Sequence, residues 1–184
     1  LWITYQSTKL GENYVAINSI LMQFIMIASF FLDAYAFSTE AVIGHTIGKR
    51  SEKSFLQAVT NSFLLSVISS LIISLIYLFS FKFIVNQLTD IDYLRYLALN
   101  YFFWIVIIPP IASFCYQFDG IFIGASQTAE MRNGMVISVI IFITSSHFLV
   151  NNFGNHGLWL SLTFFMVLRS ITLNFYFNRI LKNF

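Results

Sequence analysis

Residues 62–81 read SFLLSVISSLIISLIYLFSF, a run of 20 residues without one charged side chain. The hydrocarbon core of a bilayer is about 30 Å thick, and a helix needs about 20 apolar residues to cross it. This stretch therefore predicts a transmembrane helix, which we place at residues 55–83.

The rest of the chain is equally apolar. Of its 184 residues, 58% are hydrophobic and only 10% are charged, whereas soluble domains carry about 25% charged residues. The eight acids and ten bases are too few to coat a soluble domain of this length. No basic stripe indicates a nucleic-acid partner, and the single Cys115 leaves no disulfide framework. The composition predicts an all-α integral membrane protein.

Other apolar segments of spanning length surround the first one. We predict helices at about 14–43, 55–83, 93–126, 131–150 and 156–178, preceded by a helical remnant at 1–10. The chain opens without Met and without the charged start of a signal peptide. We therefore expect a truncated first helix and a longer parent protein. Short connections make successive helices antiparallel neighbours, in a polytopic bundle that has no soluble domain.

The Lys and Arg residues of the loops predict the orientation, because cytoplasmic loops carry an excess of them. One set of loops, with the C-terminal tail, holds Lys49, Arg50, Lys53, Arg132, Arg179 and Lys182. The opposite set holds Lys9, Lys82 and Arg95. This asymmetry places the C-terminus in the cytoplasm.

Three charged residues interrupt the predicted spans: Asp33, Asp119 and Arg169. Counted from the cytoplasmic helix ends, each lies roughly 15–24 Å into the membrane, near the midplane. Charged groups at this depth are costly and therefore indicate functional positions. Since the three residues belong to different helices at one level, we expect them to converge in one cavity.

Two interpretations of these charges stay open. In one, Arg169 neutralises a single acid and holds the bundle together. In the other, the remaining acid takes up a proton or a cation, as a coupled transporter requires. Glu40, nearer the membrane boundary, and Tyr116, on the helical face of Asp119, complete the set of cavity candidates.

Two patterns in the fourth predicted span concern helix shape. Gly120 and Gly124 form a Gly-x-x-x-Gly pattern, which lets a neighbouring helix approach closely. Pro109 and Pro110 remove two backbone donors and predict a kink. Such breaks are found in transporter cavities and also as plain structure.

The remaining residue types indicate no catalytic or metal site. The histidines are scattered, with no cysteine ligand near them, so we expect no metal. No Ser/His/Asp set, phosphate loop or pair of catalytic carboxylates appears, so we do not expect an enzyme. The tryptophans are candidate interfacial anchors; they are Trp2, Trp104 and Trp159.

Three stretches resemble the multidrug and toxic compound extrusion (MATE) family, and most closely its DinF subfamily. Residues 31–48, FLDAYAFSTEAVIGHTIG, are similar to the eighth helix of the family. Residues 116–133, YQFDGIFIGASQTAEMRN, are similar to its tenth helix and the turn after it. Residues 157–160 and 165–169 resemble the twelfth helix.

The resemblance implies one six-helix lobe, helices seven to twelve, of a two-lobe transporter in the cell membrane, with the N-terminal lobe missing. It implies export of small cationic or amphipathic compounds in exchange for H⁺ or Na⁺, with no other cofactor. Asp119 matches a tenth-helix aspartate implicated in cation coupling in the NorM-like branch. The seventh-helix acid of that branch has no match in residues 1–9, and the first-helix aspartate of DinF-like members lies outside this chain.

Three alternatives remain. A lipid-linked oligosaccharide flippase or exporter of the same superfamily tends to carry more cavity arginines than Arg169 alone. An intramembrane enzyme requires a His/Asp or paired-Asp site at the membrane surface. A purely structural subunit requires no exchangeable carboxylate.

Overall fold

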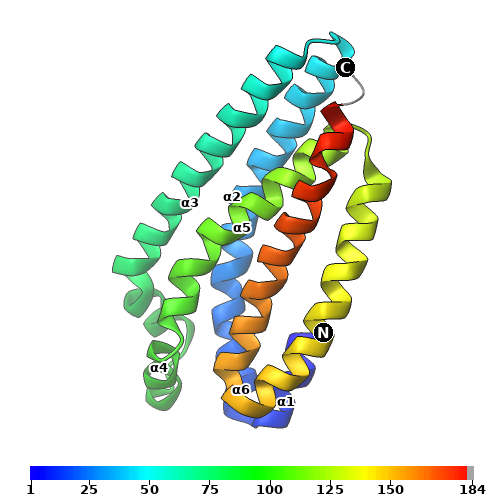
Figure 1. Cartoon of the computed structure of the whole chain (residues 1–184). Coiled ribbons are helices and arrows are strands. Elements are labelled where there is room, and N and C mark those ends of the chain that lie inside the picture. Colours follow the sequence, from blue (N-terminus) through cyan, green and yellow to red (C-terminus); the bar gives the residue numbers. More distant parts are fainter. Residues whose placement is uncertain (182–184) are drawn as a thin grey trace.

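The protein is a helical bundle, shown by a computed structural model that describes residues 1–181 (Figure 1). Lys182, one of the predicted cytoplasmic bases, lies outside the described residues. The helices are α1 (Trp2–Leu10), α2 (Glu12–Gly48), α3 (Glu52–Leu88), α4 (Asp92–Leu99), α5 (Phe102–Gly124) and α6 (Thr128–Leu181). Of these, α2, α3, α5 and α6 are long and apolar enough to cross a membrane. The predicted all-α membrane architecture is confirmed.

Helix α6 consists of two antiparallel arms, which Figure 1 shows in yellow and in orange to red. A straight helix of its 54 residues would be about 80 Å long, far more than the bilayer thickness. The reversal occurs at Gly154, whose φ of 57° and ψ of −137° leave the helical region. Directly after the turn, a Cβ atom on Gly157 would lie 2.0 Å from the carbonyl oxygen of Leu149.

The region predicted as one helix at 93–126 is divided into α4 and α5. Asn100 and Tyr101 separate them, and Tyr101 has φ −106° and ψ 1°. Helix α4 buries Leu94, Leu97 and Ala98 while its other faces are exposed. The break involves only Asn100 and Tyr101, with apolar residues on both sides, so the hydrophobic pattern gave no clear signal for it.

Pro109 and Pro110 do not interrupt α5, which continues as an α-helix through both residues. Pro110 lacks an N–H group, so the carbonyl of Val106, one turn earlier, loses its usual donor. The Ser74 hydroxyl of α3 donates to that carbonyl oxygen at 2.8 Å. A neighbouring helix thus satisfies the acceptor that the proline leaves free.

Helices α2 and α5 pack in unusually close contact. A Cβ atom on Gly120 would lie 2.4 Å from the Ala36 carbonyl oxygen, and one on Gly124 would lie 2.6 Å from the Glu40 carbonyl oxygen. The expectation that this Gly-x-x-x-Gly pattern brings a neighbouring helix close is confirmed. Asp119 immediately precedes Gly120, so the contact also fixes the position of its carboxylate relative to α2.

A buried polar network joins α1, α2 and the second arm of α6. Asn18 donates to Ser7 Oγ at 2.7 Å and to Asn155 Oδ1 at 2.6 Å. Its own Oδ1 accepts hydrogen bonds from Asn155 at 3.0 Å and from Trp159 Nε1 at 2.9 Å. Trp159 is only 2% exposed, so its expected role as an interfacial anchor is wrong: its indole is a buried structural donor.

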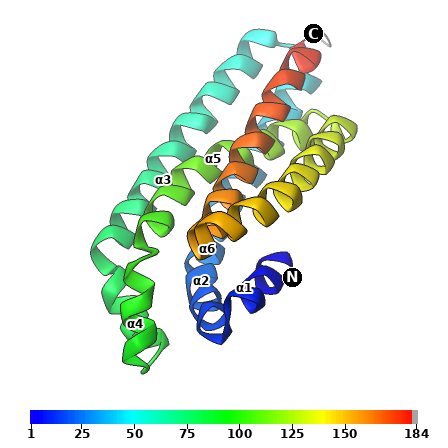
Figure 2. The same ribbon diagram turned by 60° about the horizontal axis from the view of Figure 1, so that its bottom comes forward.

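The two predicted sets of basic loop residues lie at opposite ends of the bundle. The α2–α3 turn, the α5–α6 turn and the end of α6 share one end, where the C-terminus is marked (Figure 1). The short helices α1 and α4 lie at the other end, as the turned view also shows (Figure 2).

We predict that Gly120→Ala destabilises the protein by about 1–3 kcal/mol, because the added methyl group must displace the backbone of α2. Gly48→Ala is the matched control, since no atom lies within 4 Å of the Cβ position there. Thermal unfolding of both purified variants in detergent measures the difference. Equal unfolding temperatures would show that α2 and α5 can move apart without a measurable loss of stability.

Candidate functional site

The centre of the candidate site is a buried ion pair between α5 and the second arm of α6. Arg169 Nη2 lies 2.7 Å from Asp119 Oδ2, and the side chains are 13% and 14% exposed. The described residues also include an ion pair at the helix ends, between Arg179 and Glu130 at 3.2 Å, in which the arginine is 62% exposed. Glu130 itself is 15% exposed, so the two pairs differ in the arginine, and in the Asp119–Arg169 pair both partners are largely withdrawn from water.

The pair leaves two of its own polar atoms without partners. Asp119 Oδ1 and Arg169 Nε are buried and make no hydrogen bond among the described residues. A buried polar group without a partner costs about 1–3 kcal/mol, and more when it is charged. The carboxylate therefore keeps one oxygen that can accept a proton or coordinate a cation without first breaking the bond to Arg169.

Asp33 of α2 lies beside this pair but does not join it. It is close enough to interact electrostatically with both Arg169 and Asp119, yet within residues 1–181 it makes no ion pair. Its side chain is half-buried. The three charged residues therefore do gather in one region. The Arg169 guanidinium pairs with Asp119, and the Asp33 carboxylate lies near both.

The other two candidates lie on opposite sides of this group. Tyr116, one helical turn before Asp119, lines an open groove. Glu40 lies seven residues after Asp33, about 10 Å further along α2. Its backbone packs against Gly124, and its carboxylate makes no ion pair in the described part of the chain, so the structure does not bring Glu40 to the pair.

The groove beside Tyr116 has a volume of about 570 Å³. It is formed by one face of α2, by α5 and by the second arm of α6. Its residues are Ser19, Met22, Gln23, Ile25, Met26, Ser29, Tyr116, Leu162 and Met166. Neither Asp33 nor Asp119 lines the groove, but Ser29 is one helical turn from Asp33 and Tyr116 is one turn from Asp119, so both carboxylates lie near it. A ligand in it contacts mainly apolar side chains, and the two carboxylates and the Arg169 guanidinium lie nearby.

Sequence reasoning did not single out the methionines of this groove. Met22, Met26 and Met166 come from two helices that are far apart in the chain. Their unbranched, polarizable side chains adapt to varied apolar ligands. Their gathering on one face follows from the packing of α2 against α6, for which a single sequence carries no signal.

Thr39 and Gln117 form a further polar contact that the sequence did not reveal. The Thr39 hydroxyl donates to Gln117 Oε1 at 2.7 Å, deep between α2 and α5. Gln117 Nε2 is buried without a partner in the described part of the chain. No group of three or more His, Cys, Asp and Glu side chains suited to a metal ion was found among residues 1–181.

The chain was compared with known protein families and curated proteins. A family model described as MatE matches residues 1–151. The "DNA damage-inducible protein F" of Escherichia coli (strain K12) is 34% identical over 171 residues, which are 93% of this chain and 37% of that protein. "Protein DETOXIFICATION 42" of Arabidopsis thaliana is 24% identical over 87% of this chain and 31% of its own length. The chain spans about a third of the length of these relatives.

We predict that Arg169→Gln lowers the stability by about 3–5 kcal/mol, because it leaves Asp119 as an uncompensated buried charge. The double variant Asp119→Asn/Arg169→Gln should recover most of this loss, since no net charge stays buried. Arg179→Gln is the matched control and should cost less than about 1 kcal/mol, because this arginine is 62% exposed and water can take its place beside Glu130.

Thermal unfolding in detergent tests all three variants. If the double variant is as unstable as Arg169→Gln, the loss of stability does not come from an unpaired buried charge.

Proposed function

The chain belongs to the MatE family, as its residues 31–48 and 116–133 predicted, and on this premise we propose that it is one lobe of a secondary transporter. The transporter exports small cationic or amphipathic organic compounds across a cell membrane in exchange for H⁺ or Na⁺. The second lobe completes the cavity, and the C-terminus of this lobe lies in the cytoplasm.

The observation that carries this proposal is the half-satisfied carboxylate of Asp119, one helical turn from a residue that lines an open groove. Exchange transport needs a group that binds a coupling cation in one state and releases it in the other. Asp119 Oδ1, buried and unpartnered in the described chain, is such a group. Asp33 nearby adds a second negative charge, which favours cation uptake over a permanent neutral pair with Arg169.

The groove supports the substrate class. Its methionine, isoleucine and leucine side chains favour an apolar substrate, and the carboxylates of Asp33 and Asp119, about one helical turn from its lining residues, favour a positive charge on that substrate. A ligand and a coupling cation that both require Asp33 and Asp119 compete for the same charge, and this competition couples export to cation entry. Alternating access then follows when the two lobes rock against each other around the site.

The oligosaccharide alternative receives no comparable support. Sugar phosphates would need several cationic side chains along the cavity, and the groove lining contains none. Arg169, the basic residue beside it, is already paired with Asp119.

We predict that Asp119→Asn reduces concentrative efflux of a fluorescent organic cation by about tenfold or more, because a neutral amide cannot exchange H⁺ or Na⁺. Efflux is measured in cells or proteoliposomes that carry the intact transporter, at matched protein levels. Asp90→Asn is the matched control, since that carboxylate is fully exposed in the α3–α4 turn. Undiminished efflux in Asp119→Asn at an imposed cation gradient would contradict the coupling role.

The double variant Asp119→Asn/Arg169→Gln separates coupling from folding. If the ion pair is only structural, this variant should fold and export normally. The proposal instead expects a folded protein that carries substrate downhill but does not respond to a protonophore or to the replacement of Na⁺ by K⁺.

A second prediction concerns the groove. Ser29→Trp fills the part of the groove next to the carboxylates and should reduce the export of a bulky cation more than that of a small one. Thr60→Trp, on an exposed face of α3, is the control and should leave both unchanged. Competition between the two cations in one efflux assay gives the ratio of their export rates directly. An unchanged ratio in Ser29→Trp would show that the substrate binds outside this groove.

A further inference from the structure

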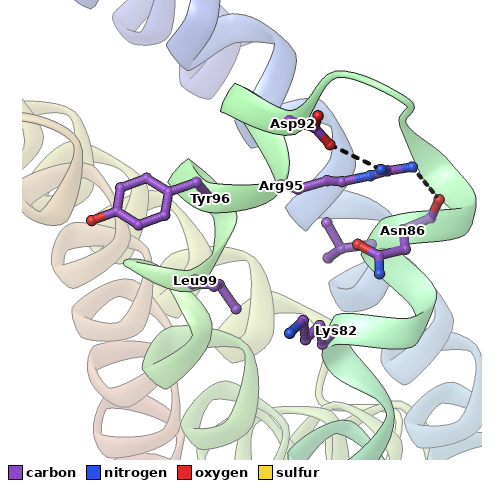
Figure 3. A pocket seen from close by; sticks show the side chains of 7 residues that line it. Lys82, Asn86, Asp92, Arg95, Tyr96 and Leu99 are labelled. Carbon is purple, nitrogen blue, oxygen red and sulfur yellow. Dashed lines mark hydrogen bonds and ion pairs between the residues drawn. The ribbon is translucent and has the colours of Figure 1, made fainter.

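A second pocket lies between the last turns of α3 and the short helix α4, at the end of the bundle opposite to the C-terminus (Figure 3). Its volume is about 310 Å³. Lys82, Asn86 and buried Val85 come from α3, and Asp92, Arg95 and Tyr96 come from α4. It is remote in the fold from Asp119, and the transport proposal makes no use of it.

The Arg95 side chain is held in place by four acceptors and connects the two helices that form this pocket. Its guanidinium donates to the carbonyl oxygens of Thr89 at 2.8 Å and Asn86 at 3.1 Å. It also pairs with Asp92 at 3.1 Å and Asp90 at 3.3 Å. These four acceptors tie the end of α3 to the start of α4. Since the charge of Arg95 is already neutralised, it holds the walls of the pocket rather than recruiting an anion.

Other polar groups in the pocket remain available. In the described part of the chain, the Lys82 ammonium forms no ion pair, and the Asn86 amide and the Tyr96 hydroxyl make no hydrogen bonds. Asp92 uses Oδ1 for Arg95, and its second oxygen has no partner among residues 1–181. Figure 3 shows Lys82 and Asp92 on opposite sides of the Arg95 side chain. The pocket therefore offers a cationic donor at one side and an anionic acceptor at the other.

The pocket lies where a membrane surface is expected. No charged residue occurs in α3 between Lys53 and Lys82, a distance of about 40 Å along a helix. This length exceeds the hydrocarbon thickness of about 30 Å, so Lys82 lies at or beyond the level where the hydrocarbon ends and lysine side chains reach toward the lipid headgroups. Exposed Tyr93 and Tyr96 of α4 are the residues typical of this boundary, and exposed Leu99 in the pocket wall offers contact to an acyl chain.

We propose that this pocket binds the headgroup of a zwitterionic phospholipid that carries a primary ammonium group, namely phosphatidylethanolamine. The phosphate lies against Lys82 and the amide of Asn86, and the ammonium group donates to Asp92. The pocket is lined by two bases, Lys82 and Arg95, and one acid, Asp92. Asp90 pairs with Arg95 from outside the lining and brings the local charge to zero, which matches a zwitterion better than an anionic lipid. The trimethylammonium group of phosphatidylcholine has no N–H to donate to Asp92, so the pocket discriminates between the two.

Native mass spectrometry of the purified intact protein, titrated with phospholipids of identical acyl chains, tests this assignment. We expect phosphatidylethanolamine to bind about tenfold more tightly than phosphatidylcholine or phosphatidylglycerol, the scale of one charge-assisted hydrogen bond. Lys82→Gln should weaken phosphatidylethanolamine binding by about tenfold, and Asp92→Asn should abolish the preference over phosphatidylcholine. Lys49→Gln, an exposed lysine at the opposite end, should change nothing.

Asp92 also forms an ion pair with Arg95, so Asp92→Asn can disturb the pocket itself. It is therefore assessed together with Lys82→Gln, which leaves that ion pair intact. Equal binding of the three lipids, or wild-type binding by Lys82→Gln, would overturn the proposal. Soluble phosphoethanolamine and inorganic phosphate are added as competitors. Displacement of the lipid by inorganic phosphate at micromolar concentration would assign the site to free phosphate and would equally overturn it, whereas retention of the lipid supports a membrane-derived ligand.

Discussion

The close contact of α2 with α5 is the constraint on which the rest of the structure depends. Side chains larger than hydrogen at Gly120 and Gly124 would collide with the carbonyl oxygens of α2, so the two backbones meet there directly. In a bilayer, helices gain little from hydrophobic association, and such backbone proximity is the main source of packing energy. This contact brings Asp33 of one helix to the level of Asp119 of the other.

The ion pair of Asp119 and Arg169 depends on that contact and extends it to a third helix. A buried pair is a weak source of stability, because desolvation offsets much of the attraction between the charges. Here the compensation is further incomplete, since one carboxylate oxygen and one guanidinium nitrogen have no partner among the described residues. An arrangement that costs free energy and is held in place by tight packing elsewhere is typical of a functional site rather than of a structural brace.

Two polar contacts away from the site are fully hydrogen-bonded. The network around Asn18 uses both polar atoms of its amide, and the carbonyl freed by Pro110 receives the hydroxyl of Ser74. Both contacts join helices at points where hydrocarbon or protein interior excludes water, and both leave the backbone or amide fully bonded. Among residues 1–181, the buried side-chain atoms without a partner belong to four neutral residues and to the pair; the neutral ones are Gln6, Ser66, Gln117 and Ser138. The charge of Asp119 and Arg169, together with the missing partners, distinguishes the pair.

The sequence alone determined that the chain is a bundle of membrane helices, because apolar runs of spanning length leave no other way to satisfy the backbone. It also selected Asp33, Asp119 and Arg169, since charged residues at membrane depth stand out against 58% hydrophobic composition. The tertiary structure decided which acid pairs with Arg169, that Glu40 lies apart, that Trp159 is buried, and that methionines of α2 and α6 share one groove. Those outcomes depend on the rotation of each helix about its axis, which is set by contacts between residues far apart in the chain and has no signal in local hydrophobic pattern.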